Sequence, residues 1–398
     1  MKILVLNAGS SSLKYQLYDM AAGQTVIAKG LCERVGSNEG VHSYELGQTE
    51  YVENLPLLDH RDAVEAVIAV LTNPGSGVIA SLDEIQAIGH RVVHGGDYFA
   101  KSVVITDEVV DRIEECVALA PLHNPAALSG IKACLELMAG TPQVAVFDTA
   151  FHQTMPPAAY RYPLPTEYYE ELKIRRYGFH GTSHRYVAER AAAFLGKPLE
   201  SLKLITCHLG NGCSLTAIKN GQSVDTSMGF TPLDGLMMGT RTGTIDPAIL
   251  LYLIDYDNRS TADVNRLVNK ESGLLGVSGL SNDLRDVIEA AAAGNEKAQL
   301  AMEMYAYSVK HFLGSYTFVL GEVDAIIFTA GVGENASAMR AMILEGLEAQ
   351  GIILDEARNL SRGGEHLIST DDSKVKVIVI PTNEELMIAQ DVKELMES

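Results

Sequence analysis

Short apolar runs alternate with stretches of helical periodicity along most of the chain. Apolar runs bounded by turn residues are typical of buried strands, and apolar positions three and four apart are typical of helices. Strands interleaved with helices predict an α/β protein. The expected strands are Ile3–Leu6, Leu13–Tyr18, Ile85–Ile88, Val144–Phe147, Leu204–Cys207, Leu215–Ile218, Ala325–Phe328 and Val375–Ile380. The expected helices include Ser183–Leu195, Ala248–Ile254, Asp283–Ala293, Lys297–Leu320, Ala338–Gln350 and Glu384–Glu397.

Capping residues define two further helices. Thr106 can accept a hydrogen bond at the start of one helix, and Pro121 ends it. Asn124 followed by Pro125 opens the next helix, which Gly140 closes.

The length of 398 residues favours two or three domains at about 150 residues each. The segment Met155–Pro165 holds four of the 13 prolines and is the candidate domain boundary. Leu6–Leu13 and Cys207–Leu215 each place a turn of small residues between two apolar runs. This echo suggests two similarly built domains, although turns of Gly and Ser are common.

The chain is strongly acidic, with 31 Lys and Arg against 51 Asp and Glu and a formal net charge of −20. Nucleic acids and anionic membranes need a basic face, so neither is an expected partner. The five cysteines form no CxxC pair, which favours reduced thiols in a cytosol. Neither a signal-peptide core nor a membrane span is recognisable, so a cytoplasmic location is expected.

Two turns could hold phosphate groups. In Asn7–Lys14, small residues let backbone N–H groups approach an anion, while the hydroxyls and Lys14 add donors and charge. The second turn is His208–Gly212. A plain hairpin that binds no ligand explains the first turn equally well. In the second turn, Asn-Gly favours a plain hairpin.

Gly331–Ala336 has the spacing GxGxxA after an expected strand, and Asp355 lies about 20 residues further on. This pattern raises an NAD-dependent oxidoreductase as the rival class of enzyme. Against it, the motif comes late in the chain and Glu334 would face a pyrophosphate. The same turn could instead hold the adenosine end of a mononucleotide.

A few cationic and acidic residues stand where ligands bind in α/β sheets. Arg91 and Arg241 are flanked by glycine or threonine and suit a phosphate or carboxylate, although a surface ion pair explains either singly. His180 could donate to a transferring group or be a buried structural histidine; the glycines around it argue against a zinc site shared with His184. Asp148 and Glu384 follow strands and could hold hydrated Mg²⁺. Helix capping explains Glu384 equally well.

Eight segments in this order resemble the acetate kinase family, which also includes propionate kinases, over nearly the full chain. They begin at Asn7, Gly89, Phe147, Arg175, Cys207, Met238, Phe328 and Pro381 and read NAGSSSLKY, GHRVVHGG, FDTAFHQTMP, RRYGFHGTSH, CHLGNGCS, MGTRTGTIDP, FTAGVGEN and PTNEE. The resemblance implies the fold shared by sugar kinases, heat-shock chaperones and actin, with two related ribonuclease-H-like α/β domains around a nucleotide cleft. It implies one domain of residues 1–150 with 385–398, a second of residues 151–384 carrying the nucleotide and the dimer interface, and a homodimer.

The resemblance also implies a role for each site residue. The metal Mg²⁺, with Mn²⁺ as a substitute, falls to Asn7 and Glu384. The catalytic group is Arg91, Asp148, His180 and Arg241, with the two arginines flanking the acyl phosphate. The nucleotide, ATP or ADP, falls to Ser10, Ser12, Lys14, His208, Leu209, Gly210, Asn211, Gly212, Asp283, Leu284, Arg285, Gly331, Val332, Gly333, Glu334 and Asn335. The pocket for the methyl group of acetate falls to Val93, Leu122, Phe179 and Pro232, beside Arg91.

The implied reaction is ATP + acetate ⇌ ADP + acetyl phosphate. Acetate is ionised at neutral pH and needs no general base, which leaves Asp148 an orienting role. Direct in-line transfer is expected, with a phosphoryl-Glu384 intermediate as the alternative. Propionate is the rival acceptor, and Val93 favours the smaller acid. An ATP-driven interaction protein is the non-enzymatic alternative, but it needs no site for an acyl anion.

Overall fold

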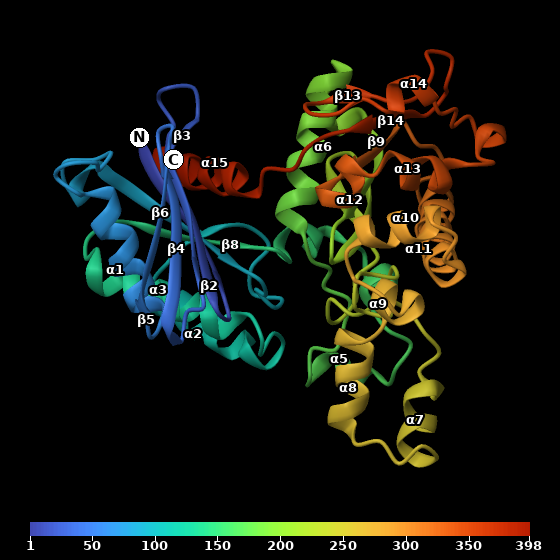
Figure 1. Cartoon of the computed structure of the whole chain (residues 1–398), viewed down its shortest axis with the longest axis horizontal. Helices are drawn as coiled ribbons and strands as arrows, with labels where there is room; N and C mark the ends of the chain where they lie inside the picture. Colours follow the sequence, from blue (N-terminus) through green and yellow to red (C-terminus); the bar gives the residue numbers. More distant parts are fainter. The chain divides into compact units, whose positions relative to one another are not determined.

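The computed structural model describes all 398 residues and divides into two compact units. Unit 1 contains Met1–Phe151 and Asn383–Ser398, and unit 2 contains His152–Thr382. Each unit has its own β-sheet covered by helices (Figure 1). None of the helices combines the length and the apolar character needed to cross a membrane.

Unit 1 is built on an eight-stranded sheet with the order β5-β4-β3-β2-β1-β6-β8-β7. The strands are β1 (Lys2–Gly9), β2 (Ser12–Asp19), β3 (Thr25–Glu33), β4 (Ser37–Leu46), β5 (Thr49–Leu57), β6 (Ile85–Val92), β7 (Val103–Val104) and β8 (Gln143–Phe147). The helices are α1 (His60–Leu71), α2 (Asp107–Glu115), α3 (Asn124–Leu137) and α15 (Glu384–Glu397). Strands β1, β6 and β8 run parallel, and β2–β5 form an antiparallel meander.

Alternation along β1 decides which helices cover which face of this sheet. Leu4 and Leu6 belong to the core that contains residues of α1 and α3, while Ile3 and Val5 belong to the core formed with α15. Successive side chains of a strand point to opposite faces, so one strand supplies both cores. A continuous apolar run at the sheet centre therefore predicts burial on both sides.

Unit 2 is built on a six-stranded sheet with the order β11-β10-β9-β12-β14-β13. The strands are β9 (Lys203–Leu209), β10 (Cys213–Lys219), β11 (Gln222–Thr226), β12 (Ala325–Thr329), β13 (His366–Leu367) and β14 (Lys376–Val379). The helices are α4 (Pro157–Tyr160), α5 (Thr166–Glu170), α6 (Gly181–Leu195), α7 (Ala248–Asp255), α8 (Thr261–Lys270), α9 (Gly273–Ser278), α10 (Leu284–Ala292), α11 (Glu296–Leu320), α12 (Ala330–Asn335), α13 (Ser337–Leu344) and α14 (Glu356–Asn359).

The two sheets share one topology. In each, a three-stranded antiparallel meander (β1–β3, β9–β11) is extended through its first strand by two parallel strands (β6 and β8, β12 and β14). Even the short edge strands correspond, because β7 pairs antiparallel with β8 and β13 pairs antiparallel with β14. The strand order and directions are those of a ribonuclease-H-like domain present twice, so the α/β fold expected from the sequence is confirmed.

The chain passes from unit 1 to unit 2 after Phe151 and returns to unit 1 after Thr382. Helix α6 follows β8 in sequence but packs on β9 and β12, and α15 follows β14 but packs on β1 and β6. The chain therefore crosses between the units twice, which is why the C-terminal residues belong to unit 1.

All eight strands expected from the apolar runs are present. The expected helix Ala338–Gln350 is wrong in its second half, because α13 ends at Leu344 and Gly346 has φ +76°, in the left-handed region that ends helices. Strands β3–β5 escaped the sequence analysis because their polar and apolar residues alternate without a continuous apolar run.

Candidate active site

A first group of candidate site residues lies at the carboxyl ends of the parallel strands of unit 1. Asn7 lies near the end of β1, Arg91 lies on β6, and Asp148 follows β8. Pairing of β6 with both neighbours brings these residues together although they are far apart in sequence. Ligands bind at this edge in open α/β sheets, as the sequence predicted for Asp148.

Arg91 is held by hydrogen bonds through three of its nitrogens. Its Nε and Nη2 donate to the two carboxylate oxygens of Asp148 at 2.9 and 2.6 Å, and Nη1 donates to Asn7 Oδ1 at 3.3 Å. Burial by itself would lower the pKa of Arg91, but the negative charges of Asp148 and Glu384 raise it by more. The net pKa therefore lies above its usual value, and the guanidinium stays charged. A bidentate pair of this kind fixes the plane of the guanidinium and both side chains with it.

Glu384 is the first residue of α15, which Asn383 caps by accepting a hydrogen bond from the backbone N–H of Leu386 at 3.0 Å. The Glu384 atom Oε1 is buried and has no hydrogen-bond partner. Burial raises the pKa of Glu384 to about 7, and the Asp148 charge acts in the same direction while Arg91 opposes it. A buried carboxylate oxygen without a partner is what a cation would satisfy.

The side chains of Asn7, Asp148 and Glu384 in this group offer oxygen atoms, the ligand type that Mg²⁺ prefers. No group of three or more His, Cys, Asp and Glu side chains in the chain could hold a metal ion alone. Mg²⁺ is often held by only one or two carboxylates, with the remaining ligands from water and substrate phosphates. The side-chain oxygens of Asn7 and Glu384 therefore fit the ligand preference of Mg²⁺.

The segment Asn7–Lys14, the first turn that could hold phosphate groups, forms a tight hairpin between β1 and β2. Gly9 pairs with Ser12, so Ser10 and Ser11 alone connect β1 to β2, and both are exposed. Lys14 lies opposite Asn7 in the hairpin and forms an ion pair with Glu385 at 2.5 Å. The Lys14 ammonium, on the strand next to the one that carries Asn7, is therefore paired with a carboxylate of α15.

A second group of candidate site residues lies in unit 2, around the hairpin between β9 and β10. Gly210, Asn211 and Gly212 connect these strands. A Cβ placed on Gly212 would lie 3.4 Å from Arg241 Nη1 and 3.6 Å from His180 Nε2. Because residue 212 has no side chain, a space remains that is bordered by both Arg241 Nη1 and His180 Nε2.

Arg241 differs from Arg91 in having no carboxylate partner. Its Nη1 donates to the backbone oxygen of Pro232 at 3.3 Å, and it forms no ion pair. Burial lowers the Arg241 pKa. A partly buried guanidinium without a counter-charge favours the binding of an anion.

His180 has φ +55°, an unusual left-handed conformation for a residue other than glycine, and immediately precedes α6. Its ring stacks on His208 with 4.1 Å between centroids, and its Nδ1 lies 2.9 Å from Ser214 Oγ. His184 is fully buried, and both its ring nitrogens lie 2.7 Å from hydroxyl oxygens. Because hydroxyl groups engage both nitrogens of His184, these contacts argue against a zinc site shared by His180 and His184.

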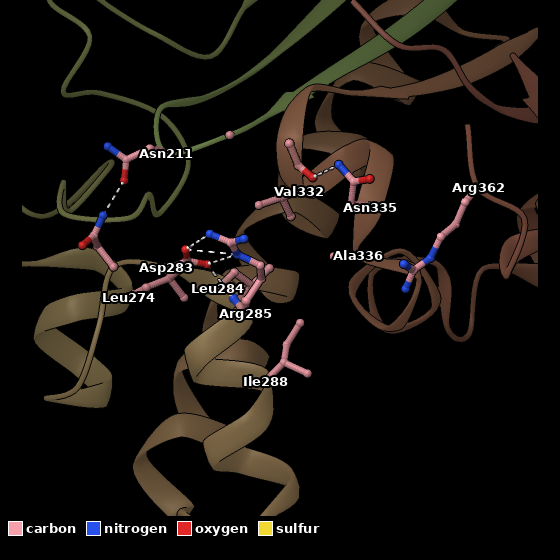
Figure 2. A pocket seen from close by; sticks show the side chains of 13 residues that line it. Asn211, Leu274, Asp283, Leu284, Arg285, Ile288, Val332, Asn335, Ala336 and Arg362 are labelled. Carbon is pink, nitrogen blue, oxygen red and sulfur yellow. Dashed lines mark hydrogen bonds and ion pairs between the residues drawn. The ribbon is translucent and has the colours of Figure 1, made fainter. Parts of the chain in front are cut away.

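A cavity of about 540 Å³ opens in unit 2 beside the same hairpin (Figure 2). The hairpin, the start of α10 and helix α12 all contribute to its wall. Eight residues expected at the nucleotide line it, namely Gly210, Asn211, Asp283, Leu284, Arg285, Gly331, Val332 and Asn335. Its wall combines apolar side chains with polar and charged ones, as in binding sites for small molecules.

Five lining residues escaped the sequence analysis, namely Leu274, Asn282, Ile288, Ala336 and Arg362. Asn282 Nδ2 donates to Asn211 Oδ1 at 3.1 Å, which joins the hairpin to the segment before α10. Only its place next to Asp283 could have signalled Asn282, and nothing in the sequence distinguishes Arg362.

Eight expected nucleotide residues do not line the cavity: Ser10, Ser12 and Lys14 of unit 1, and His208, Leu209, Gly212, Gly333 and Glu334 of unit 2. Leu209 is buried. A Cβ on Gly333 would lie 3.3 Å from the backbone of Phe328, so glycine there lets α12 approach β12. Glu334 Oε1 accepts a hydrogen bond from the backbone N–H of Thr382 at 3.2 Å. Leu209, Gly333 and Glu334 therefore pack within or against the elements that form the cavity, and they do not line it.

The residues expected around the acetate methyl group divide between the units. Val93 and Leu122 belong to unit 1, and Phe179 and Pro232 belong to unit 2. Leu122 is 71% exposed, which is unusual for leucine, whereas Phe179 is buried. Pro232 contacts Arg241 through its backbone oxygen, so it lies beside the unpaired guanidinium.

A duplicated ribonuclease-H-like fold with a nucleoside-sized cavity and paired cationic sites defines a phosphotransferase of the actin-like class. Within that class, the chain belongs to the acetokinase family, whose model matches residues 2–390. It is 56% identical over 399 residues to acetate kinases of Caldanaerobacter subterraneus and Methanosarcina thermophila, covering 100% of this chain and 99% and 98% of theirs.

Solved structures agree with this assignment. The acetate kinase of Porphyromonas gingivalis has 47% identity and a TM-score of 0.96, with 99% of both chains covered. A propionate kinase of Francisella tularensis has 44% identity and a TM-score of 0.92, also with 99% of both chains covered. The oxidoreductase hypothesis is therefore wrong. The GxGxxA segment forms the short helix α12 after β12, and this sheet contains antiparallel strands where a dinucleotide-binding sheet is parallel.

Proposed function

We propose that this protein transfers the terminal phosphoryl group of ATP reversibly to acetate, giving acetyl phosphate and ADP. The observation that carries the proposal is the pair Arg241 and His180, which face one space over Gly212. That space adjoins the hairpin whose other residues, Gly210 and Asn211, line the nucleoside cavity. A nucleotide bound there would direct its phosphates along the hairpin towards Arg241 and His180.

Phosphoryl transfer from ATP to acetate requires these residues to align the two reactants and to compensate their negative charge. Acetate is already a nucleophile at neutral pH, so no side chain has to remove a proton. Negative charge spreads over the phosphoryl oxygens in the loose transition state. In this proposal Arg241 and His180 donate to those oxygens, and Arg91 orients the acyl group while Asp148 holds Arg91 in its plane.

Asn7 and Glu384 would hold Mg²⁺, with Mn²⁺ as a substitute. When bound, the ion would neutralise part of the negative charge of the nucleotide phosphates. The proposal is supported by the buried, unpartnered Oε1 of Glu384. Its pKa of about 7 means that the ion competes with a proton for this carboxylate near neutral pH. Glu384→Gln should therefore raise the Mg²⁺ concentration needed for half-maximal rate, while Glu345→Gln, at an exposed residue after α13, should not.

The acceptor is acetate in preference to propionate, with Val93 limiting the space for a longer chain. One methylene in an apolar pocket is worth about 1 to 3 kcal/mol, so activity on propionate is expected at a lower kcat/KM. A hydroxamate assay with ATP, Mg²⁺ and acetate, propionate or butyrate tests both the reaction and the order of acceptors. Absence of acyl hydroxamate with every acid would overturn the proposal.

Transfer in a single in-line step is favoured over a phosphoryl-Glu384 intermediate. Glu384 has Arg91 and Asp148 as its charged neighbours, which suits a metal ligand better than a nucleophile. Inversion at a chiral γ-phosphate supports the single step, and retention would favour the intermediate. A crystal structure with an unreactive ATP analogue and acetate should show both Arg91 and Arg241 at the terminal phosphate, and guanidiniums turned to bulk solvent would contradict it.

We also propose a homodimer formed through α7. This helix has the sequence AILLYLID and no buried residue. Within it Leu251 and Tyr252 are 63% and 61% exposed, and Tyr256, at its C-terminal end, is 74% exposed. An apolar helix without a covered face is typical of an interface. Leu251→Glu should convert the dimer to a monomer in light scattering, whereas Leu360→Glu, at an equally exposed leucine on another element, should not.

A further inference from the structure

A chain of hydrogen bonds runs behind His180 inside unit 2. His180 Nδ1 lies 2.9 Å from Ser214 Oγ, and the same Oγ lies 2.7 Å from His184 Nε2. On the far side of the His184 ring, Nδ1 lies 2.7 Å from Thr206 Oγ1. Ser214, His184 and Thr206 are fully buried, so their hydrogen bonds are made to one another and not to bulk water.

This chain must have a direction. Burial lowers the pKa of His184 well below its usual value, so its ring is neutral. A neutral imidazole has one N–H donor and one acceptor nitrogen. His184 therefore donates to one of its two hydroxyl neighbours and accepts from the other. Ser214, which lies between the two histidines, must then pass the same direction on to His180.

The end of the chain at Thr206 decides between the two directions. Its hydroxyl has one hydrogen-bond partner, the Nδ1 atom of His184. If His184 donated to Thr206, the buried hydroxyl proton of Thr206 would have no acceptor, and buried donors without partners are unfavourable. Thr206 therefore donates to His184, His184 donates to Ser214, and Ser214 donates to His180 Nδ1.

The consequence falls on the opposite nitrogen of His180. A ring that accepts at Nδ1 carries its proton on Nε2, and Nε2 is the atom that stands with Arg241 over Gly212. A donor at this point attracts phosphoryl oxygens, whereas a lone pair would repel them. We propose that Ser214 is a positioning residue that fixes His180 as its Nε2–H tautomer, with Thr206 and His184 setting the direction of the Ser214 hydroxyl.

The role of the His180 Nε2 proton in the reaction rests on the proposed function. The position of that proton does not. The position is measured by ¹⁵N spectra of the histidine-labelled full chain, with the His180 signals assigned by their loss in His180→Ala. We expect an unprotonated Nδ1 and a protonated Nε2. A proton on Nδ1, alone or together with one on Nε2, overturns the inference. Thr206→Val removes the first donor and should leave a mixture of the two tautomers; an unchanged spectrum in this variant overturns the role of Thr206.

Kinetics test whether the tautomer matters. Ser214→Ala should lower kcat on the order of 10- to 100-fold, the range seen when a group that orients a histidine ligand is removed, with little change in the KM for ATP. Ser214→Thr keeps the hydroxyl and should recover part of the loss. The matched control is Thr216→Val, which removes another buried hydroxyl of β10, bonded to Thr226 Oγ1 at 3.0 Å and not to a histidine. This control should keep kcat within about twofold of the wild-type value.

A double variant separates this role from a general structural one. If Ser214 acts through His180, then Ser214→Ala should cost nothing further in a His180→Ala background. Wild-type kcat in Ser214→Ala, or full additivity of the two losses, overturns the inference. Wild-type kcat in His180→Ala would instead overturn the proposed role of His180 in transfer, while leaving the tautomer measurement valid.

Discussion

Arg91 donates to both carboxylate oxygens of Asp148, and this bidentate pair crosses from β6 to the end of β8. Asp148 is almost completely buried. Removing the arginine would leave a buried carboxylate without a counter-charge, which typically costs about 3 to 5 kcal/mol. Arg91→Ala should therefore lose both activity and stability, measured as the free energy of unfolding in urea.

Arg241→Ala provides the contrast. Arg241 has no carboxylate partner, so its removal leaves no buried charge behind. We expect the free energy of unfolding to change by about 1 kcal/mol or less, while kcat falls by a factor on the order of 100 to 1,000. Arg241→Lys should not recover the rate, because the planar fork is lost. Equal destabilisation by the two arginine variants would contradict this account of their surroundings.

Gly212→Ala tests the space between His180 and Arg241. The added methyl would lie at ordinary contact distances from both side chains, and the backbone there is compatible with alanine, so the fold should be retained. The methyl would nevertheless occupy the position proposed for phosphoryl oxygens, and we expect kcat to fall on the order of 100-fold. Gly75→Ala is the matched control, since its Cβ would meet only Asn73 Oδ1 at 3.5 Å, and its kcat should be unchanged. Normal turnover in Gly212→Ala would place the reacting group elsewhere.

Arg340 connects stability to nucleotide binding. It is buried on α13, where Nη1 donates to the backbone oxygens of Gly333 and Glu334 at 2.9 Å and Nη2 donates to that of Asn359 at 2.6 Å. Burial lowers its pKa to about 10. Arg340→Met would leave these oxygens unpaired, and we expect a loss of roughly 3 to 5 kcal/mol and a raised KM for ATP, because α12 lines the cavity. Arg266→Met, at an exposed arginine of α8, is the control, and an unchanged KM for ATP in Arg340→Met would contradict the link.

His42 should make the protein sensitive to acid. It is fully buried on β4 with Nε2 3.1 Å from Tyr15 Oη, and burial lowers its pKa from 6.5 to about 4. The unfolded chain binds this proton more tightly, so the stabilisation is complete above pH 6.5 and is lost as the pH falls through 4. It amounts to roughly 3 kcal/mol. His42→Gln should flatten the decline of the unfolding free energy between pH 6.5 and 4, whereas His311→Gln, at an exposed histidine, should not.

Local sequence predicted the central strands and the two hairpins well because continuous apolar runs and small turn residues act over a few neighbours. It failed for β3–β5, where one face of the sheet is exposed and the apolar pattern is interrupted. It also overlooked Arg340, which looks like any charged residue of a helix until the fold brings Asn359 and the end of α12 against it.

The sequence by itself determined the α/β class, the duplicated hairpins and the family to which the chain belongs, because these depend on local patterns and ordered motifs. The tertiary structure decided the state of each charged group: Arg91 is paired 57 residues away with Asp148, Arg241 is left without a counter-charge, and the ring nitrogens of His184 are both engaged. These differences arise from strand pairing and burial between distant segments, which set electrostatic energies that no local pattern of residues records.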